Sequence, residues 1–314
     1  MRAVVVREFG GPDVMSIAEV DEPVPGDGTV LIDVDTIGVN FGDLLLRGGQ
    51  YMGRGALPVV PGWEVVGRRV DTGERVVALL AAGGYAERVV APEADVVSLP
   101  EDVPDDVALA MVIQGATAWH LLETPSTVAA GEIVFVTGAG SGVTHLVVQL
   151  AKLREAGAVI VAASSPEKAQ FVSSLGADAV IRTDQVEDLT TAAREAAGRP
   201  GAHHLIDMVG EPQFGALMRA LRPGGRAVVY GVAGGQTASV NTGAMLKHGL
   251  TVAGLWLGHG GAEPISATLG RLFDYWRAGE LTPTLGPTFS AADAADAHRA
   301  VEARNAVGKV LLKF

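Results

Sequence analysis

Three glycines within five residues form the segment of this chain best suited to chemistry. Residues 138–142 read Gly-Ala-Gly-Ser-Gly; they follow the β-branched run 133–137 and lead into a stretch of helical spacing at 142–155. In such a position glycines let backbone N–H groups approach a pyrophosphate, whose charge the positive end of the helix dipole stabilises. Elsewhere, the same glycines would more often form an ordinary tight turn. Because a second apolar run follows about 20 residues further on, the arrangement predicts a dinucleotide-binding site.

A threonine interrupts the usual pattern of small residues after this turn. Thr144 stands where the helix is expected to pack closely on the preceding strand, a position that usually holds a small residue. A β-branched side chain there is either absorbed by local repacking, or it displaces the helix and weakens the pyrophosphate site. Both outcomes stay open from the sequence.

The end of the second apolar run carries hydroxyl and positively charged side chains. Ser164, Ser165 and Lys168 follow the run 159–163, and Arg182 ends the next one. A site selective for NAD places a carboxylate here to accept from the ribose 2′-hydroxyl, whereas a 2′-phosphate needs donors and positive charge. The residues present therefore predict NADPH. The alternative is that the serines only begin a helix and that the lysine is solvated.

Two patterns of hydrophobic residues divide the chain into two expected domains. Up to about residue 99, short β-branched runs alternate with Gly, Pro and Asp, which is typical of a strand-rich, barrel-like domain. From residue 132, apolar runs alternate with helical stretches, and this alternation specifies parallel strands joined by crossover helices. We expect residues 1–112 and 257–314 in one domain and residues 113–256 in the other. The expected strands are 3–6, 30–39, 64–70, 75–79, 87–91, 133–137, 159–163, 179–181, 204–208, 226–230, 250–255 and 309–313, and the expected helices are 105–123, 142–155, 166–175, 186–197, 211–221, 263–278 and 291–304.

The composition excludes several classes of partner and chemistry. The net charge of -12 and the pI near 5.0 repel phosphate backbones, so no nucleic-acid partner is expected. The absence of cysteine excludes disulfides, thiolate metal sites and cysteine nucleophiles. The first residues lack the features of a signal peptide, and the most apolar stretch, 107–122, is shorter than a membrane span. We therefore expect a cytoplasmic protein without a membrane partner.

Short motifs spread over the whole chain resemble those of one enzyme superfamily. They are Gly38-Val-Asn40-Phe-Gly-Asp43, Arg47-Gly-Gly-Gln-Tyr51, Gly83-Gly-Tyr85, Gly115-Ala-Thr117, Leu221-Arg-Pro-Gly-Gly225 and Gly308-Lys309, together with the glycine turn. In this order they resemble the zinc-independent quinone oxidoreductases and enoyl reductases of the medium-chain dehydrogenase/reductase superfamily. The resemblance implies an α/β fold, with a GroES-like β-rich catalytic domain and a Rossmann domain built on a doubly wound parallel sheet. It also implies NADPH-dependent transfer of hydride to a quinone or to an α,β-unsaturated carbonyl compound.

The resemblance also bears on metal binding. Zinc-dependent members of the superfamily hold their catalytic metal with a cysteine where this chain has Asn40, and with a histidine where it has Trp63. This chain has no cysteine, and its seven histidines do not fall at ligand spacings. We therefore expect no metal site. His203 and His204, which open an expected strand, are expected to pack at its edge or in the core.

Residues of both domains receive roles from the resemblance. Asn40 is expected beside the nicotinamide and its ribose, Thr117 near the same region, and Leu255 and Trp256 beside the ring. Tyr51 follows Asn40 by eleven residues, the offset at which the enoyl reductases carry their proposed proton donor. Tyr51 and Asn40 are therefore the catalytic candidates. The alternative is that Tyr51 is a loop aromatic that covers the cleft.

The remaining expected contacts are with the substrate and the cofactor. Phe41 and Trp63 are expected to line the substrate pocket together with Tyr51 and Trp256, with a core position as the alternative for Trp63. The expected cofactor-binding set comprises Asn40, Thr117, Gly138, Gly140, Ser141, Gly142, Val143, Ser164, Ser165, Lys168, Arg182, Val209, Gly231, Val232, Leu255, Trp256 and Lys309.

A rival interpretation keeps this fold but uses the cleft without redox turnover. Such a protein would be a cyclase, an isomerase or a binding protein with a degenerate cofactor site. Thr144 motivates this reading, as does Thr183, which stands where many relatives carry a tyrosine. The small-molecule substrate is not identified by the sequence. The apolar run 250–257 is expected to pair with its copy in a homodimer, and Asp43 and Arg47 are expected to form a structural pair.

Overall fold

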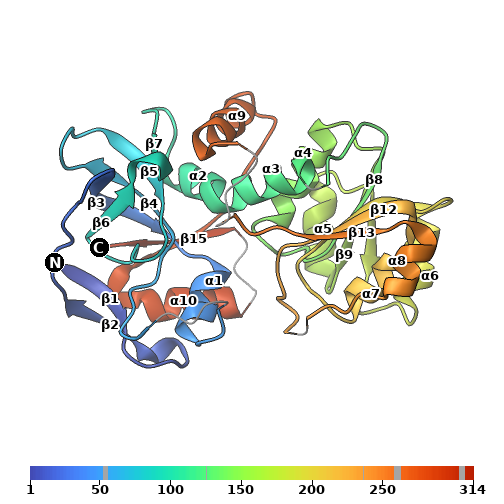
Figure 1. Ribbon diagram of the computed structural model, residues 1–314, viewed down its shortest axis with the longest axis horizontal. Coiled ribbons are helices and arrows are strands. Elements are labelled where there is room, and N and C mark those ends of the chain that lie inside the picture. The colour runs from blue at the N-terminus through green and yellow to red at the C-terminus, as the bar shows by residue number, and fades with distance from the viewer. Residues whose placement is uncertain (52–55, 125, 236, 258–262, 304–307) are drawn as a thin grey trace. The chain divides into compact units, whose positions relative to one another are not determined.

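The chain forms two compact units, and the computed structural model describes all residues except 52–55, 125, 236, 258–262 and 304–307 (Figure 1). The first unit comprises residues 1–113, 264–273 and 283–314, and the second comprises residues 114–263 and 274–282. Residues 274–282 thus belong to the second unit, whereas the sequence places all of 257–314 in the first domain.

Mainly antiparallel strands build the first unit, as the sequence predicts. β1 (Arg2–Val6) pairs with β2 (Met15–Glu19), and a larger sheet has the order β14-β15-β3-β4-β5-β7, with β6 pairing β3 outside this path. The C-terminal strand β15 (Lys309–Lys313) runs antiparallel to β3 (Thr29–Gly38), so the chain returns to its first sheet. The other strands are β4 (Glu64–Arg69), β5 (Arg75–Leu79), β6 (Arg88–Pro92), β7 (Val96–Ser98) and β14 (Leu285–Ser290).

Short helices pack on this sheet and carry the residues of interest. α1 (Phe41–Arg47) begins immediately after β3, with Asn40 as its N-cap, and it buries Leu44 and Leu46. α10 (Ala294–Glu302) packs against α1 and buries His298. The remaining helical segments are η1 (Pro12–Val14), η2 (Glu93–Asp95), α2 (Asp105–Leu109) and η5 (Ala291–Asp293), and α9 (Ile265–Arg277) contributes residues to both units.

A parallel sheet forms the centre of the second unit, with helices on its two faces (Figure 1). Its strand order is β10-β9-β8-β11-β12-β13, and every pairing is parallel. The strands are β8 (Ile133–Val136), β9 (Ala158–Ala163), β10 (Ala179–Arg182), β11 (Ala202–Asp207), β12 (Leu221–Val229) and β13 (Thr251–Gly254). The helices are α3 (Ala116–Glu123), α4 (Thr144–Leu153), α5 (Pro166–Ser174), α6 (Leu189–Ala197), α7 (Gln213–Met218) and α8 (Thr242–His248).

This strand order confirms the predicted doubly wound sheet. The chain leaves β8 towards β9 and β10 on one side and later returns to add β11, β12 and β13 on the other. Ligands of such sheets bind beyond the carboxyl ends of the strands where the order reverses, which here is the end of β8. The glycine turn 138–142 follows β8 directly.

The helical stretch expected over 105–123 contains an irregular turn. Between α2 and α3 the backbone is π-helical over Ala110–Gly115, a geometry that often marks functional positions. Helical spacing in the sequence does not distinguish such a turn from a regular helix. Among the residues that the structure describes, no helix has both the length and the apolar character needed to cross a membrane.

Candidate active site

Neighbouring side chains lie close to all three glycines of the turn in the second unit. Gly138 has a φ of 77°, and a Cβ atom there would overlap the side chain of Met208. A Cβ atom on Gly140 would lie 3.1 Å from Cε of Lys168, and one on Gly142 would overlap the amide of Gln114. Gly138 is therefore required by its backbone conformation, whereas a side chain at Gly140 or Gly142 would have to displace the end of Lys168 or Gln114. This leaves bare backbone at the start of α4.

Two buried side chains brace the strand ends that carry the turn. Thr137 Oγ1 donates to Asp207 Oδ1 at 2.8 Å and accepts from the backbone N–H of Met208 at 3.0 Å. Asp207 also accepts from the backbone of Gly210 at 3.0 Å, and burial raises its pKa. The ends of β8 and β11 are thereby tied together. Sequence reasoning missed this pair, although a carboxylate that ends an apolar strand was a visible signal.

The side chain of Thr144 packs within the turn and forms hydrogen bonds there. It is fully buried, and its hydroxyl donates to the carbonyl of Thr137 at 2.9 Å while it accepts from Ser141 Oγ at 2.9 Å. The hydroxyl of Tyr230 lies 3.3 Å away, and burial raises the pKa of Tyr230 to about 12. Of the two outcomes that the sequence left open, these hydrogen bonds favour local repacking. Thr144 links α4 to β8 by a hydrogen bond where a smaller residue would rely on packing alone.

Lys168 is the cation that the fold brings to the turn. Its stem lies over Gly140, and its ammonium group lies 3.4 Å from Ser164 Oγ. Ser165 caps α5 by accepting from the backbone of Lys168 at 3.3 Å, so for this serine the helix-cap interpretation holds. Arg182 makes two hydrogen bonds to Asp184, at 2.8 and 2.6 Å, and these partly neutralise its charge.

A polar side chain that the sequence reasoning missed lies on the π-helical turn. Gln114 contacts Gly142, and its buried Oε1 accepts no hydrogen bond from the residues that the structure describes. Thr117, one turn further on, is 8% exposed. A glutamine inside an otherwise apolar stretch was the available signal, because a buried amide oxygen needs a donor.

The other expected cofactor residues of the second unit lie at the same edge of the sheet. Val143 precedes α4, while Val209, Gly231 and Val232 follow the carboxyl ends of β11 and β12. Leu255 and Trp256 follow β13, and Trp256 is 45% exposed. Because carboxyl ends of parallel strands share one edge, these residues and the glycine turn lie at the same edge of the sheet.

Asn40 of the first unit is held by a buried ion pair. Its Oδ1 accepts from Lys309 Nζ at 2.9 Å, and its Nδ2 donates to Glu64 Oε1 at 2.8 Å. Lys309 and Glu64 are fully buried and paired with each other, and Lys309 also donates to the carbonyl of Val39 at 3.2 Å. These partners orient the Asn40 amide unambiguously. The ammonium of Lys309 is therefore engaged beneath Asn40, which differs from the direct cofactor contact expected from the sequence.

Asp43 and Arg47 do not form the pair expected from their spacing. Asp43 accepts from the backbone N–H groups of Asn40 at 2.8 Å and Gly62 at 2.9 Å. Arg47 pairs instead with Glu302 and donates to the carbonyl of Gly10 at 3.1 Å. Burial raises the pKa of Asp43 to about 7, against the lowering effect of the two backbone hydrogen bonds.

The aromatic residues expected in the substrate pocket separate into two groups. The rings of Tyr51 and Trp63 pack with centroids 4.8 Å apart and planes tilted by 33°, and Trp63 also packs against Gly42 of α1. Phe41 instead lines a cavity of about 410 Å³ together with Phe9 and Leu45. The structure therefore brings Tyr51 and Trp63 together and places Phe41 beside a different set of residues.

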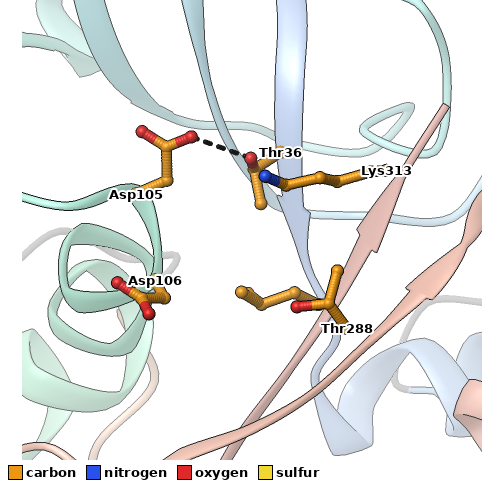
Figure 2. A pocket seen from close by; sticks show the side chains of 6 residues that line it. Thr36, Asp105, Asp106, Thr288 and Lys313 are labelled. Atoms are coloured by element: carbon orange, nitrogen blue, oxygen red, sulfur yellow. Dashed lines mark hydrogen bonds between the residues drawn. The ribbon is translucent and has the colours of Figure 1, made fainter.

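A second cavity of the first unit, of about 250 Å³, has charged walls (Figure 2). Asp105 and Asp106 face Thr36, Thr288 and Lys313 across it. Thr36 Oγ1 donates to Asp105 at 2.9 Å, and Asp105 also pairs with Arg75. This carboxylate is thus satisfied by protein partners.

The histidines expected to be structural have protein partners. His204 Nδ1 lies 2.5 Å from Ser126 Oγ and its Nε2 lies 2.7 Å from Glu132, while His203 contacts Arg222 at 2.7 Å. Ser126 and His204 are buried at the amino end of β11, away from the glycine turn. In the described part of the chain, no group of three or more His, Cys, Asp or Glu side chains is arranged to hold a metal ion.

The β-rich unit and the doubly wound unit with its bare glycine turn define an oxidoreductase of the dinucleotide-binding class. Comparisons with known proteins agree: the family model for zinc-binding dehydrogenases matches residues 142–273, and the alcohol dehydrogenase GroES-like domain matches residues 26–101. Quinone oxidoreductase-like protein 2 of Bos taurus is 32% identical over all of this chain and 92% of its own length. The 2-haloacrylate reductase of Burkholderia sp is 31% identical over 99% of this chain and 98% of its own. A mycobacterial structure complexed with NADPH is 33% identical, with a TM-score of 0.91 and complete coverage of both chains.

The chain belongs to the medium-chain dehydrogenase/reductase superfamily and, within it, to the quinone oxidoreductase type. This confirms the family that the sequence motifs indicated, and with it an oxidoreductase activity. The name of the zinc-binding family model describes the wider family, since this chain has none of the cysteines that zinc-dependent members use.

The buried carboxylate of Asp43 predicts a pH dependence of stability. Its pKa is about 7 in the folded protein and 3.8 in its usual state, so the folded state binds the proton more tightly. The free energy of unfolding therefore falls as the pH rises from about 4 to about 7. Relative to Asp43→Asn, which does not titrate, the wild type is expected to lose about 1 kcal/mol per pH unit in this range. Urea denaturation of both proteins at several pH values measures the difference, and parallel curves would contradict the assignment.

Proposed function

We propose that this protein is an NADPH-dependent reductase that transfers hydride to a quinone or to an α,β-unsaturated carbonyl compound. The observation that carries the proposal is the bare glycine turn at the end of β8, with Lys168 lying over Gly140. Backbone N–H groups at a helix start suit a pyrophosphate, and a lysine beside Ser164 suits a 2′-phosphate. The mycobacterial relative complexed with NADPH supports the same cofactor.

The fit of the second unit to the dinucleotide rests on three features. Three glycines leave backbone exposed in the turn, Lys168 supplies positive charge, and the Oε1 atom of Gln114 needs a donor. In this proposal residues 138–142 bind the pyrophosphate through their backbone, Ser164 and Lys168 bind the 2′-phosphate, and Gln114 accepts a hydrogen bond from the cofactor. When bound, the cofactor supplies the hydride.

The first unit supplies groups that orient the reactants and move a proton. The ion pair beneath Asn40 fixes its Oδ1 and one N–H of its Nδ2, and the second N–H then donates near the nicotinamide and ribose. Tyr51 donates its hydroxyl proton to the oxyanion or enolate that forms as the acceptor takes up the hydride. Hydride and proton together complete the two-electron reduction of the acceptor. Trp63, which packs against Tyr51, limits the motion of the phenol ring.

Thr144, one of the two residues that motivated the non-redox alternative, no longer supports it. Thr144 is accommodated within the turn by hydrogen bonds, and Thr183 bonds through its backbone to the carbonyl of Ala163 at 2.9 Å. A cyclase, isomerase or binding protein would bind NADPH without oxidising it, and this is the outcome that separates the two functions.

Loss of the Lys168 ammonium group is expected to weaken NADPH selectively. Oxidation of NADPH or NADH is followed by absorbance with 1,4-benzoquinone and a series of 2-enoyl thioesters as acceptors. The wild type is expected to oxidise NADPH. Lys168→Ala is expected to raise the KM for NADPH about 10-fold or more and to change the KM for NADH less than about twofold, because only NADPH carries the 2′-phosphate.

Lys152→Ala is the matched control for this experiment. Lys152 also lies on the second unit, but its ammonium group pairs with Asp178 at 2.9 Å. The control is expected to behave as the wild type. Equal effects of Lys168→Ala on the two cofactors would contradict the assigned role, and binding of NADPH with no oxidation by any acceptor would favour the non-redox function.

Tyr51→Phe tests the proton donor. Proton transfer by a positioned side chain contributes about 100-fold or more, so kcat is expected to fall by that order while the KM for NADPH stays nearly constant. Tyr275→Phe, which removes a hydroxyl group from α9, is the matched control and is expected to keep the wild-type kcat. A kcat for Tyr51→Phe within about twofold of the wild type would leave Tyr51 the role of an aromatic cover.

We further propose that the protein is a homodimer formed through β13, the last strand of its sheet. The backbone N–H of Leu255, which follows β13, donates to β12. Alternate N–H groups of a parallel strand face opposite sides, so those of Val252 and Gly254 face away from β12.

Val252→Pro removes one of these outward N–H donors and keeps the hydrogen bonds between β13 and β12. Light scattering is expected to give a dimer for the wild type and a monomer for Val252→Pro, with Leu246→Ala, on the exposed face of α8, as the control. A monomeric wild type would contradict the proposal.

A further inference from the structure

A chain of buried polar side chains crosses the first unit and ends at Asn40. Arg47 Nη1 lies 3.1 Å from His298 Nδ1, and His298 Nε2 lies 3.0 Å from the hydroxyl of Tyr85. Burial and the neighbouring carboxyl of Asp43 raise the pKa of the Tyr85 hydroxyl, and Asp43 accepts from the backbone of Asn40 at 2.8 Å. Asp43, Tyr85 and His298 are each 0% exposed, so water does not compete for these bonds.

The direction of each hydrogen bond in this chain is determined. Arginine only donates, so Nδ1 of His298 accepts. Burial and the charge of Arg47 lower the pKa of His298 to about 3, so the ring is neutral and its single proton is on Nε2, which donates to Tyr85. The hydroxyl of Tyr85 is then free to direct its own proton to Asp43, which accepts when it is ionised. The chain therefore runs in one direction, from Arg47 through His298 and Tyr85 to Asp43.

Asp43 is the point at which this chain acts on the backbone. Besides Asn40, its carboxylate accepts from the N–H of Gly62 at 2.9 Å, and the ring of Tyr85 fills the space that a side chain at Gly62 would occupy. One carboxylate thus fixes both the turn that precedes α1 and the turn that precedes β4. We propose that Tyr85 and His298 are positioning residues, which set the place of Asn40 through Asp43. The proposal rests on the function proposed above, in which Asn40 contacts the cofactor.

The chemistry of the chain argues for positioning beyond packing. Apolar side chains of similar size fill a core at least as favourably as buried polar groups do. A fully satisfied polar network instead selects one arrangement of the groups that it joins. Phe at position 85 and Leu at position 298 would keep the core filled while removing the donors. Loss of the donors is therefore expected to affect the placement of Asn40 more than folding, and a small misplacement of a group near the reacting atoms costs rate.

Kinetics of three variants test this role. Tyr85→Phe and His298→Leu are expected to lower kcat for reduction of 1,4-benzoquinone by NADPH on the order of 10-fold. The Kd for 2′,5′-ADP, which lacks the nicotinamide and would be bound by the second unit alone, is expected to change less than about twofold. His298→Gln keeps one acceptor and one donor, and it is expected to recover most of the lost kcat.

His204→Leu is the matched structural control. His204 is also a buried histidine between a hydroxyl and a charged partner, Ser126 and Glu132, but it lies in the second unit at the amino end of β11. This variant is expected to lower the melting temperature as the His298 variants do and to keep the wild-type kcat. A kcat for His298→Gln equal to that for His298→Leu, or a kcat for His204→Leu reduced to the same extent, would overturn the proposal.

Hydrogen exchange provides a readout that does not need catalysis. The amides of Asn40 and Gly62 both donate to Asp43, so their exchange, measured by mass spectrometry without cofactor, is expected to be faster in Tyr85→Phe and His298→Leu but not in His204→Leu. Unchanged exchange in the folded variants would overturn the proposal. If the wild type does not oxidise NADPH, the proposed function is contradicted. Faster exchange in the variants would then still support the role of Tyr85 and His298 in positioning Asn40. If Tyr85→Phe does not fold, the comparison of His298→Leu with His298→Gln tests the proposal.

Discussion

Close approach of bare backbone at residues 138–142 is the constraint on which the rest of the second unit depends. A phosphorylated ligand binds main-chain N–H groups only where no Cβ atom intervenes, and here Met208, Lys168 and Gln114 already occupy the space that side chains on the three glycines would need. The packing that bars side chains also delivers a cation and an amide to the turn. The hydroxyl of Thr137, bonded to Asp207, then holds the ends of β8 and β11 in register beneath it.

The first unit holds the side-chain amide of one residue, Asn40, in a fixed position. Asn40 follows the last residues of β3, and its two ends are controlled separately: Lys309 and Glu64 hold the side chain, and Asp43 holds the backbone. Burying so many charges is costly unless each has a partner. Their partners come from β4, β15 and α1, so the strands that close the sheet also complete the site.

Local patterns in the sequence predicted the sheets, the glycine turn and the family. The alternation of apolar runs with helical stretches and the spacing of glycines are both properties of neighbouring residues. The spacing of Asp43 and Arg47 suggested a pair on one helix face, yet their partners come from other segments, and Arg47 meets His298 across 251 residues. β14 was missed because its Gly and Pro read as a turn, and the π-helical turn because its side-chain spacing imitates an α-helix. Long-range polar partners of this kind have no periodicity to detect.

In the proposed function, the hydrogen bonds of Asn40 offer a way for a site without cysteine ligands to polarise a reactant. By resemblance, zinc-dependent relatives place a metal ligand at this position, and here the positive charge is instead that of Lys309, bonded to Asn40 Oδ1. An ammonium group that pulls electron density from the amide oxygen makes the N–H groups on the same amide stronger donors, because hydrogen bonds in series polarise one another. Glu64 balances the charge of Lys309, so the ion pair keeps the amide oriented without leaving an uncompensated buried charge. In the proposed function, the donor that faces the reactants would therefore be a neutral amide made stronger by the charge of Lys309.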